Sequence, residues 1–153
     1  MAGSLTNKGR YKLLGWAFRS VTIPTNFYLA LCSNDTPPTV DTNTMADVSE
    51  IAAGSGYTAG GVSLDPNATD FDVFSQDNTN DLGLIQIRDV VYTASGGSIP
   101  DSGNGARWGV LTDDAVTVSE REVFAFFDLV DDLSVTDGEA ITIADATIRN
   151  KLA

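Results

Sequence analysis

The chain has 153 residues, a formal net charge of −12 at neutral pH, no histidine and one cysteine. This length fits a single domain with a sizeable core, which we expect to comprise an arm at 1–22 and a β-sandwich at 23–153. The acidic charge disfavours nucleic acid as a partner, and without imidazole there is no Ser-His or Cys-His triad and hardly any route to catalytic zinc.

The first element predicted is an amphipathic helix over Leu5–Ser20, which Thr6 or Asn7 can cap. Apolar residues share one face of this helix because they recur at helical spacing. That face consists of Tyr11, Leu14 and Phe18, widened by Leu13, Trp16 and Ala17. Gly9 and Gly15 weaken the helix, since each costs about 1 kcal/mol relative to alanine in a helix interior.

Basic residues concentrate in this first segment, at Lys8, Arg10, Lys12 and Arg19, and neither lysine nor arginine occurs from Ser20 to Ile87. One interpretation is that these four side chains contact an acidic surface of a partner. The alternative is a helix with a solvated basic face.

The next segment predicts a strand at Phe27–Cys32 followed by a long polar connection from Ser33 to Gly56, with a helical turn within Met45–Ala53. A loop of this length in a compact domain is usually functional or contacts a partner. We therefore add Pro37 and Pro38 of this loop to the expected partner contacts.

Further strands are predicted at Tyr57–Leu64, Leu82–Thr93, Ala106–Thr112, Arg121–Leu129 and Ala140–Lys151, with a loop region from Asp65 to Asp81 interrupted by Phe71–Phe74. The run Val123–Phe127 is apolar on both faces, so it should be central in its sheet. Seven or eight short strands after one helix predict a mainly β fold, an antiparallel sandwich or barrel.

Little in the sequence points to catalysis or to a cofactor. Cys32 lies in an apolar run and is interpreted as a buried, inert thiol. Paired acids occur at Asp113–Asp114, Glu120/Glu122 and Asp131–Asp132, but the aromatic surplus of a sugar cleft is missing, so we expect no enzyme.

Calcium is the one cofactor that the residues leave open, because several hard oxygen ligands follow one another in a loop. They are Asp70, Asp72, Asp77, Asn78, Asn80 and Asp81. Solvated acidic loops are the preferred interpretation, since the spacing does not match an EF-hand.

Several stretches resemble small virion proteins of tailed bacteriophages, described as head decoration, minor structural or tail-fibre-like proteins. These stretches are the amino-terminal helix, Phe27–Leu31, the turn Gly54–Tyr57 leading into Val62–Leu64, Ala106–Leu111 and Val135–Ile143. The resemblance implies a β-sandwich without catalysis, located in the virion and made in the host cytoplasm.

The leading functional hypothesis is therefore a capsid decoration or cement protein that contacts the major capsid protein and further copies of itself. We expect no membrane partner, because no apolar run approaches the roughly 20 residues of a spanning helix. The alternative is a tail or fibre adhesin that binds host glycan through exposed Trp108, Tyr57 and Phe71, although core packing is the preferred role of Trp108. A third class, a cellular carbohydrate-binding sandwich, is disfavoured because no export signal is visible.

Overall fold

The computed structural model describes residues 1–151 and confirms the mainly β fold with one amino-terminal α-helix. The strands are β1 (Ala2–Leu5), β2 (Phe27–Cys32), β3 (Val62–Leu64), β4 (Val73–Asp77), β5 (Leu82–Ile87), β6 (Val90–Thr93), β7 (Ala106–Thr112), β8 (Val123–Leu133), β9 (Ala140–Ile143) and β10 (Ala146–Lys151). The helix is α1 (Asn7–Phe18), and two 3₁₀ turns are η1 (Met45–Asp47) and η2 (Val118–Glu120).

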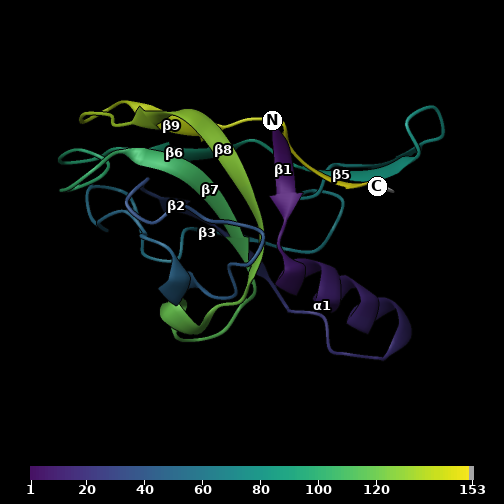
Figure 1. Cartoon of the computed structure of the whole chain (residues 1–153). Coiled ribbons are helices and arrows are strands. Elements are labelled where there is room, and N and C mark those ends of the chain that lie inside the picture. Colours follow the sequence, from purple (N-terminus) through teal and green to yellow (C-terminus); the bar gives the residue numbers. More distant parts are fainter. Residues whose placement is uncertain (152–153) are drawn as a thin grey trace.

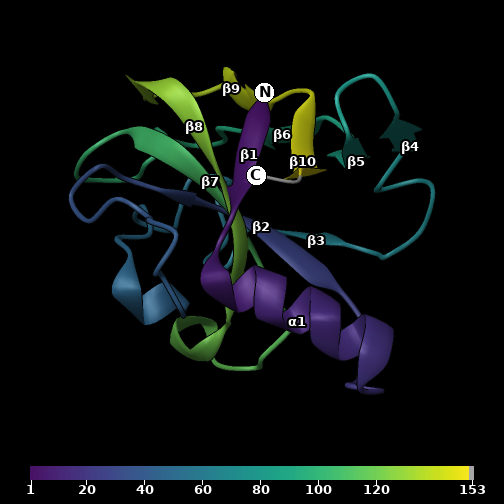
Figure 2. The same ribbon diagram turned by 45° about the vertical axis from the view of Figure 1, so that its right-hand side comes forward.

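Eight strands form one curled sheet in the order β3-β2-β7-β8-β1-β10-β5-β4, while β6 and β9 form a small second sheet (Figures 1 and 2). Every strand pair is antiparallel except β1 with β10. Fully buried side chains such as Leu29, Ile87, Phe127 and Ile143 form the core. As expected, Val123–Phe127 lies in a central strand, β8, between β7 and β1.

The amino terminus differs from the prediction, because Ala2–Leu5 form strand β1 rather than the start of the helix. This strand pairs with β8 on one side and with β10 on the other, so it joins the two halves of the large sheet. Gly3 lies against Phe127, where an added Cβ would come within 2.3 Å of the ring. The strand is thus fixed by its neighbours rather than by its own β-propensity.

Helix α1 begins after Thr6, whose hydroxyl accepts a hydrogen bond from the Gly9 amide at 2.9 Å, as the capping prediction had it. Only part of the expected apolar stripe is buried: Leu13 and Trp16 pack against the core, whereas Tyr11, Leu14 and Phe18 are 67%, 61% and 78% exposed. The side that faces the sheet instead carries Gly9, where an added Cβ would lie 2.1 Å from the Phe124 carbonyl oxygen. A glycine lets the helix backbone approach a strand closely.

Several strand boundaries also differ from the prediction. The stretch Leu82–Thr93 divides at Arg88–Asp89 into β5 and β6, and Ala140–Lys151 divides into β9 and β10, so each stretch supplies both sheets. Of Tyr57–Leu64, only Val62–Leu64 is a strand. The loop region after Asp65 contains β4, which forms a hairpin with β5.

Candidate interaction surface

An apolar groove of about 580 Å³ lies between α1 and the sheet formed by β10 and β5. Its walls include Leu13 and Trp16 from the helix, Ile85 from β5, Ile148 from β10 and Phe71 from the loop before β4. No lining residue carries a charge. We call this feature the α1 groove, and its chemistry suits an apolar surface rather than a charged ligand.

Large apolar side chains remain exposed at the groove and on the helix beside it. Within the groove, Ile23 is 55% and Phe74 is 85% exposed. On α1, the exposed set is the one already described, Tyr11, Leu14 and Phe18, which we call the outer face of α1. Large exposed apolar side chains that gather in this way mark sites where another molecule binds.

The inner wall of the groove is an aromatic cluster that fixes α1 to the sheet. The Trp16 ring stacks on Phe124 with centroids 5.4 Å apart and meets the edge of Phe27 at 5.9 Å. Phe27 in turn contacts Phe71 at 5.8 Å. Such aromatic contacts each stabilise the fold by about 0.5–1.5 kcal/mol beyond the contribution of the apolar area that they bury. This wall therefore holds α1 in a fixed position on the sheet.

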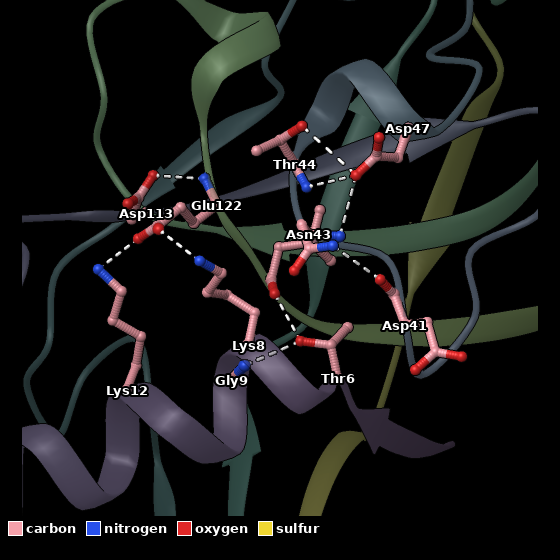
Figure 3. A network of polar contacts seen from close by, with 11 residues as sticks. Thr6, Lys8, Gly9, Lys12, Asp41, Asn43, Thr44, Asp47, Asp113 and Glu122 are labelled. Carbon is pink, nitrogen blue, oxygen red and sulfur yellow. Dashed lines mark hydrogen bonds and ion pairs between the residues drawn. The ribbon is translucent and has the colours of Figure 1, made fainter.

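The four predicted basic contacts separate into two groups. Lys8 and Lys12 both bind the carboxylate of Glu122, Lys8 at 3.0 Å, and thereby attach the helix to the residue that precedes β8 (Figure 3). Arg10 and Arg19 are exposed and form no ion pair with any residue of 1–151. Two of the four are therefore already used inside the chain, and the role of all four as partner contacts stays a prediction.

The electrostatics around Glu122 favour its charged form. Partial burial opposes ionisation, but hydrogen bonds from Lys12 and Lys8 outweigh it, so the pKa of Glu122 lies below its ordinary value. Asp113 accepts a hydrogen bond from the Glu122 amide at 2.9 Å, yet burial raises the pKa of its carboxyl. These groups hold an interface within the molecule and line a cavity of only about 10 Å³.

The proline loop lies against the start of the helix. Pro37 is exposed and Pro38 is buried. The Asn7 amide donates to the Val40 carbonyl at 2.7 Å, and the Asn7 side chain donates to Asp41 at 2.8 Å. The loop and the helix, which the sequence offered as separate contacts, are thus joined at one place.

Arg121 is a buried cation that the sequence did not single out. It is 8% exposed, and its guanidinium donates to the Ala115 carbonyl at 3.0 Å and to the Gly60 carbonyl at 3.1 Å. Its Cζ lies 3.7 Å from the centre of the Tyr28 ring, a close cation–π contact. These bonds connect the η2 loop with the Gly60–Gly61 turn, which is a structural role.

The side chains proposed for glycan binding are not presented together. Tyr57 is buried, with its hydroxyl donating to Glu50 at 2.7 Å, so its interpretation as an exposed contact is wrong. Trp108 is half-buried, meets the edge of Phe126 at 5.9 Å and donates to Asn34 at 3.1 Å. Phe71 lines the α1 groove. Cys32 is fully buried as expected, and burial raises the pKa of its thiol.

Two of the acidic loop residues have partners within the chain. Asp70 binds Arg88, and Asp77 accepts the amide hydrogens of Thr79 and Asn80 at 2.9 and 3.1 Å. Residues 1–151 contain no group of three or more acidic or cysteine side chains placed to hold a metal ion. The preferred interpretation, solvated acidic loops without a cofactor, stays a prediction, and so does the calcium alternative.

The described part of the chain also contains no helix with the length and apolar character needed to cross a membrane. Comparison with known proteins found no matching family model, no matching curated protein and no matching solved structure. The assignment of function therefore depends on the α1 groove and its surroundings.

Proposed function

We propose that this chain is a non-enzymatic structural protein of a tailed-phage particle, acting as a capsid decoration or cement protein. In this role the α1 groove and the outer face of α1 bind an apolar segment of the major capsid protein. The single observation that supports this most is the uncharged groove, flanked by apolar side chains that are more than half exposed.

A bound molecule has to cover both the groove and the outer face of α1. The groove alone has the volume of a small-molecule pocket, but Phe18 and Leu14 lie on the outer face of α1 and do not line it. A small ligand in the groove would leave these two side chains in water. A protein segment can cover both features, and helices and extended chains bind such grooves through regularly spaced apolar side chains.

Charge indicates the composition of that segment. The groove itself is uncharged, but the chain from Ser20 to Ile87, which supplies much of its rim, has no lysine or arginine and is rich in aspartate. Asp65, Asp70 and Asp72 are sequence neighbours of the lining residues Pro66 and Phe71, and acidic side chains beside an apolar groove complement a segment whose apolar face is flanked by basic residues.

Deletion of residues 1–20 would not test this proposal, because it would remove β1 from the middle of the sheet. Point substitutions at exposed positions are cleaner. Ile23→Asp and Phe18→Asp should leave the fold intact, because both side chains are more than half exposed. The matched control is Val116→Asp, at a position that is 98% exposed and does not line the groove.

The assay measures binding of purified protein to particles from the encoding phage that lack the chain. We expect the Ile23 and Phe18 variants to bind about tenfold more weakly or worse, and Val116→Asp to bind like the unaltered chain. Equal binding by all three would overturn the proposal. Labelling on tails instead of heads would support the fibre alternative.

A further inference from the structure

The outer edge of β4 is an open strand edge. β4 is the last strand of the large sheet and pairs only with β5, at one end of the molecule (Figure 2). Its residues are exposed from Val73 to Gln76 and half-buried at Asp77, so no other segment of 1–151 covers it. In such a strand, alternate residues direct their N–H and C=O groups away from the sheet, ready to pair with another strand.

This edge lacks most of the features that usually prevent pairing. Open edges are commonly protected by charged side chains, above all lysine, by proline or a bulge, or by being very short, and the one charged residue of β4 is Asp77 at its end. The β4 sequence Val-Phe-Ser-Gln-Asp contains neither lysine nor proline, and its pairing with β5 runs through five consecutive residues without a bulge. The opposite edge, β3, is only three residues long and is protected by that length.

Phe74 adds an apolar contact to the open edge. It is 85% exposed on a strand whose backbone is fixed by β5. Phe74 also lines the α1 groove, and so much of its ring is exposed that an added strand could cover part of it.

We propose that β4 pairs antiparallel with β4 of a second copy, across a two-fold axis at Ser75, so that the large sheets of two chains become continuous. This register pairs all five residues of the strand. Ser75 faces Ser75 of the second copy, Phe74 faces Gln76, and Val73 faces Asp77. The two Phe74 rings become diagonal neighbours on one face, within the reach of aromatic side chains.

The register is also compatible with the acidic charge of the chain. No carboxylate in β4 faces another, because Asp77 lies opposite Val73. Nevertheless, both chains carry a net charge of −12, which opposes their approach. The contact is smaller than the standard interface of about 1,600 Å², so the dimer should be weak and reversible, and added salt should strengthen it by screening the repulsion.

The test uses the isolated full-length chain and does not depend on the role in a particle. Sedimentation equilibrium should show a monomer–dimer equilibrium with micromolar to millimolar dissociation, tighter at 0.5 M than at 0.05 M sodium chloride. Ser75→Glu places like charges opposite each other and should weaken dimerisation by about tenfold or more. The matched control is Ser63→Glu, also exposed but on β3, which should change nothing.

A second variant tests the register directly. Ser75→Cys should form an intermolecular disulfide on mild oxidation, because paired positions on antiparallel strands lie within disulfide range. Ser63→Cys should not, and the native Cys32 is fully buried and cannot interfere. A chain that is monomeric at every concentration and salt level, or a dimer that Ser63→Glu weakens and Ser75→Glu does not, would overturn the proposal. Neither serine lines the α1 groove, but Phe74 does, so the particle-binding test with the Ile23 and Phe18 variants is run far below the dimer dissociation constant, where the two results are independent.

Discussion

Replacing Gly9 by alanine is the sharpest test of how α1 is held. Alanine is the better helix former by about 1 kcal/mol, so propensity alone predicts a more stable protein. The structure predicts the opposite, because the new Cβ would lie 2.1 Å from the Phe124 carbonyl oxygen, a backbone atom that cannot rotate away. The helix would have to move off β8 by roughly 1 Å, since such contacts need at least about 3 Å.

That displacement disturbs several contacts at once. It weakens the stacking of Trp16 on Phe124 and the hydrogen bonds of Thr6 to β8. Overpacking of this kind typically costs about 1–3 kcal/mol, and the lost stacking adds up to about 1.5 kcal/mol. After subtracting the propensity gain, we expect a net loss of about 2 kcal/mol in the free energy of unfolding, or about 4–8 °C in melting temperature for a chain of this size.

Urea denaturation followed by tryptophan fluorescence and circular dichroism measures this change, and Trp16 reports on the docking of the helix. Gly15→Ala is the matched control. There the added Cβ would lie 3.1 Å from a methyl group of Val21, a partly exposed side chain that can move. We expect this control to be neutral or stabilised by up to about 1 kcal/mol. If Gly9→Ala were as stable as Gly15→Ala, the close contact between α1 and β8 would be refuted.

Three further predictions concern stability. Glu122→Gln should lower the free energy of unfolding by about 1–2 kcal/mol at pH 7. Because the fold lowers the pKa of Glu122, the difference in stability from the unaltered chain should disappear as the pH falls through that pKa, below 4.5. A pH-independent difference in urea denaturation would argue against the two ion pairs. Arg121→Met should lower the free energy of unfolding by about 2–3 kcal/mol, measured by a thermal melt, because two carbonyl groups lose their donor. Tyr28→Phe keeps the ring and should be nearly neutral. Equal losses in the two variants would contradict the role given to the guanidinium. Leu14→Ser and Phe18→Ser should change stability by less than about 0.5 kcal/mol, and a large loss in either would show that the outer face of α1 is packed within the chain.

The strands that the sequence predicted best are those with a continuous apolar run between polar segments. β2 and β7 have the predicted bounds because Phe27–Cys32 and Ala106–Thr112 are bounded on both sides by turn residues or polar ones. β1 was missed because Ala2–Leu5 have little β-propensity and are extended only by pairing with β8 and β10. A local sequence pattern cannot predict pairing with strands that lie more than a hundred residues further along the chain.

The orientation of α1 shows a different limit of pattern reading. Apolar spacing identified Tyr11, Leu14 and Phe18 as one face, which is correct, but implied that this face is the buried one. Gly9 decides the orientation, because its close approach to the Phe124 backbone requires the absence of a side chain, and an apolar pattern does not record an absent side chain.

The candidate site could not be predicted from sequence, because its walls come together only in the fold. Leu13, Ile85 and Ile148 lie far apart in the chain and individually look like ordinary core residues. The burial of Arg121 could not be predicted either, because a cation between Glu120 and Glu122 is typical of a solvated, charged stretch. The position of Lys8 and Lys12 beside Glu122 likewise depends on tertiary packing of the helix on β8.

Cryo-electron microscopy of the intact particle, with this chain fitted into the density, tests the central claim most directly. The account predicts that the chain lies on the head, that the α1 groove holds side chains of a shell subunit, and that Phe18 is covered. A groove open to solvent in the assembled particle, with the chain attached through another surface or absent from the particle, would contradict it.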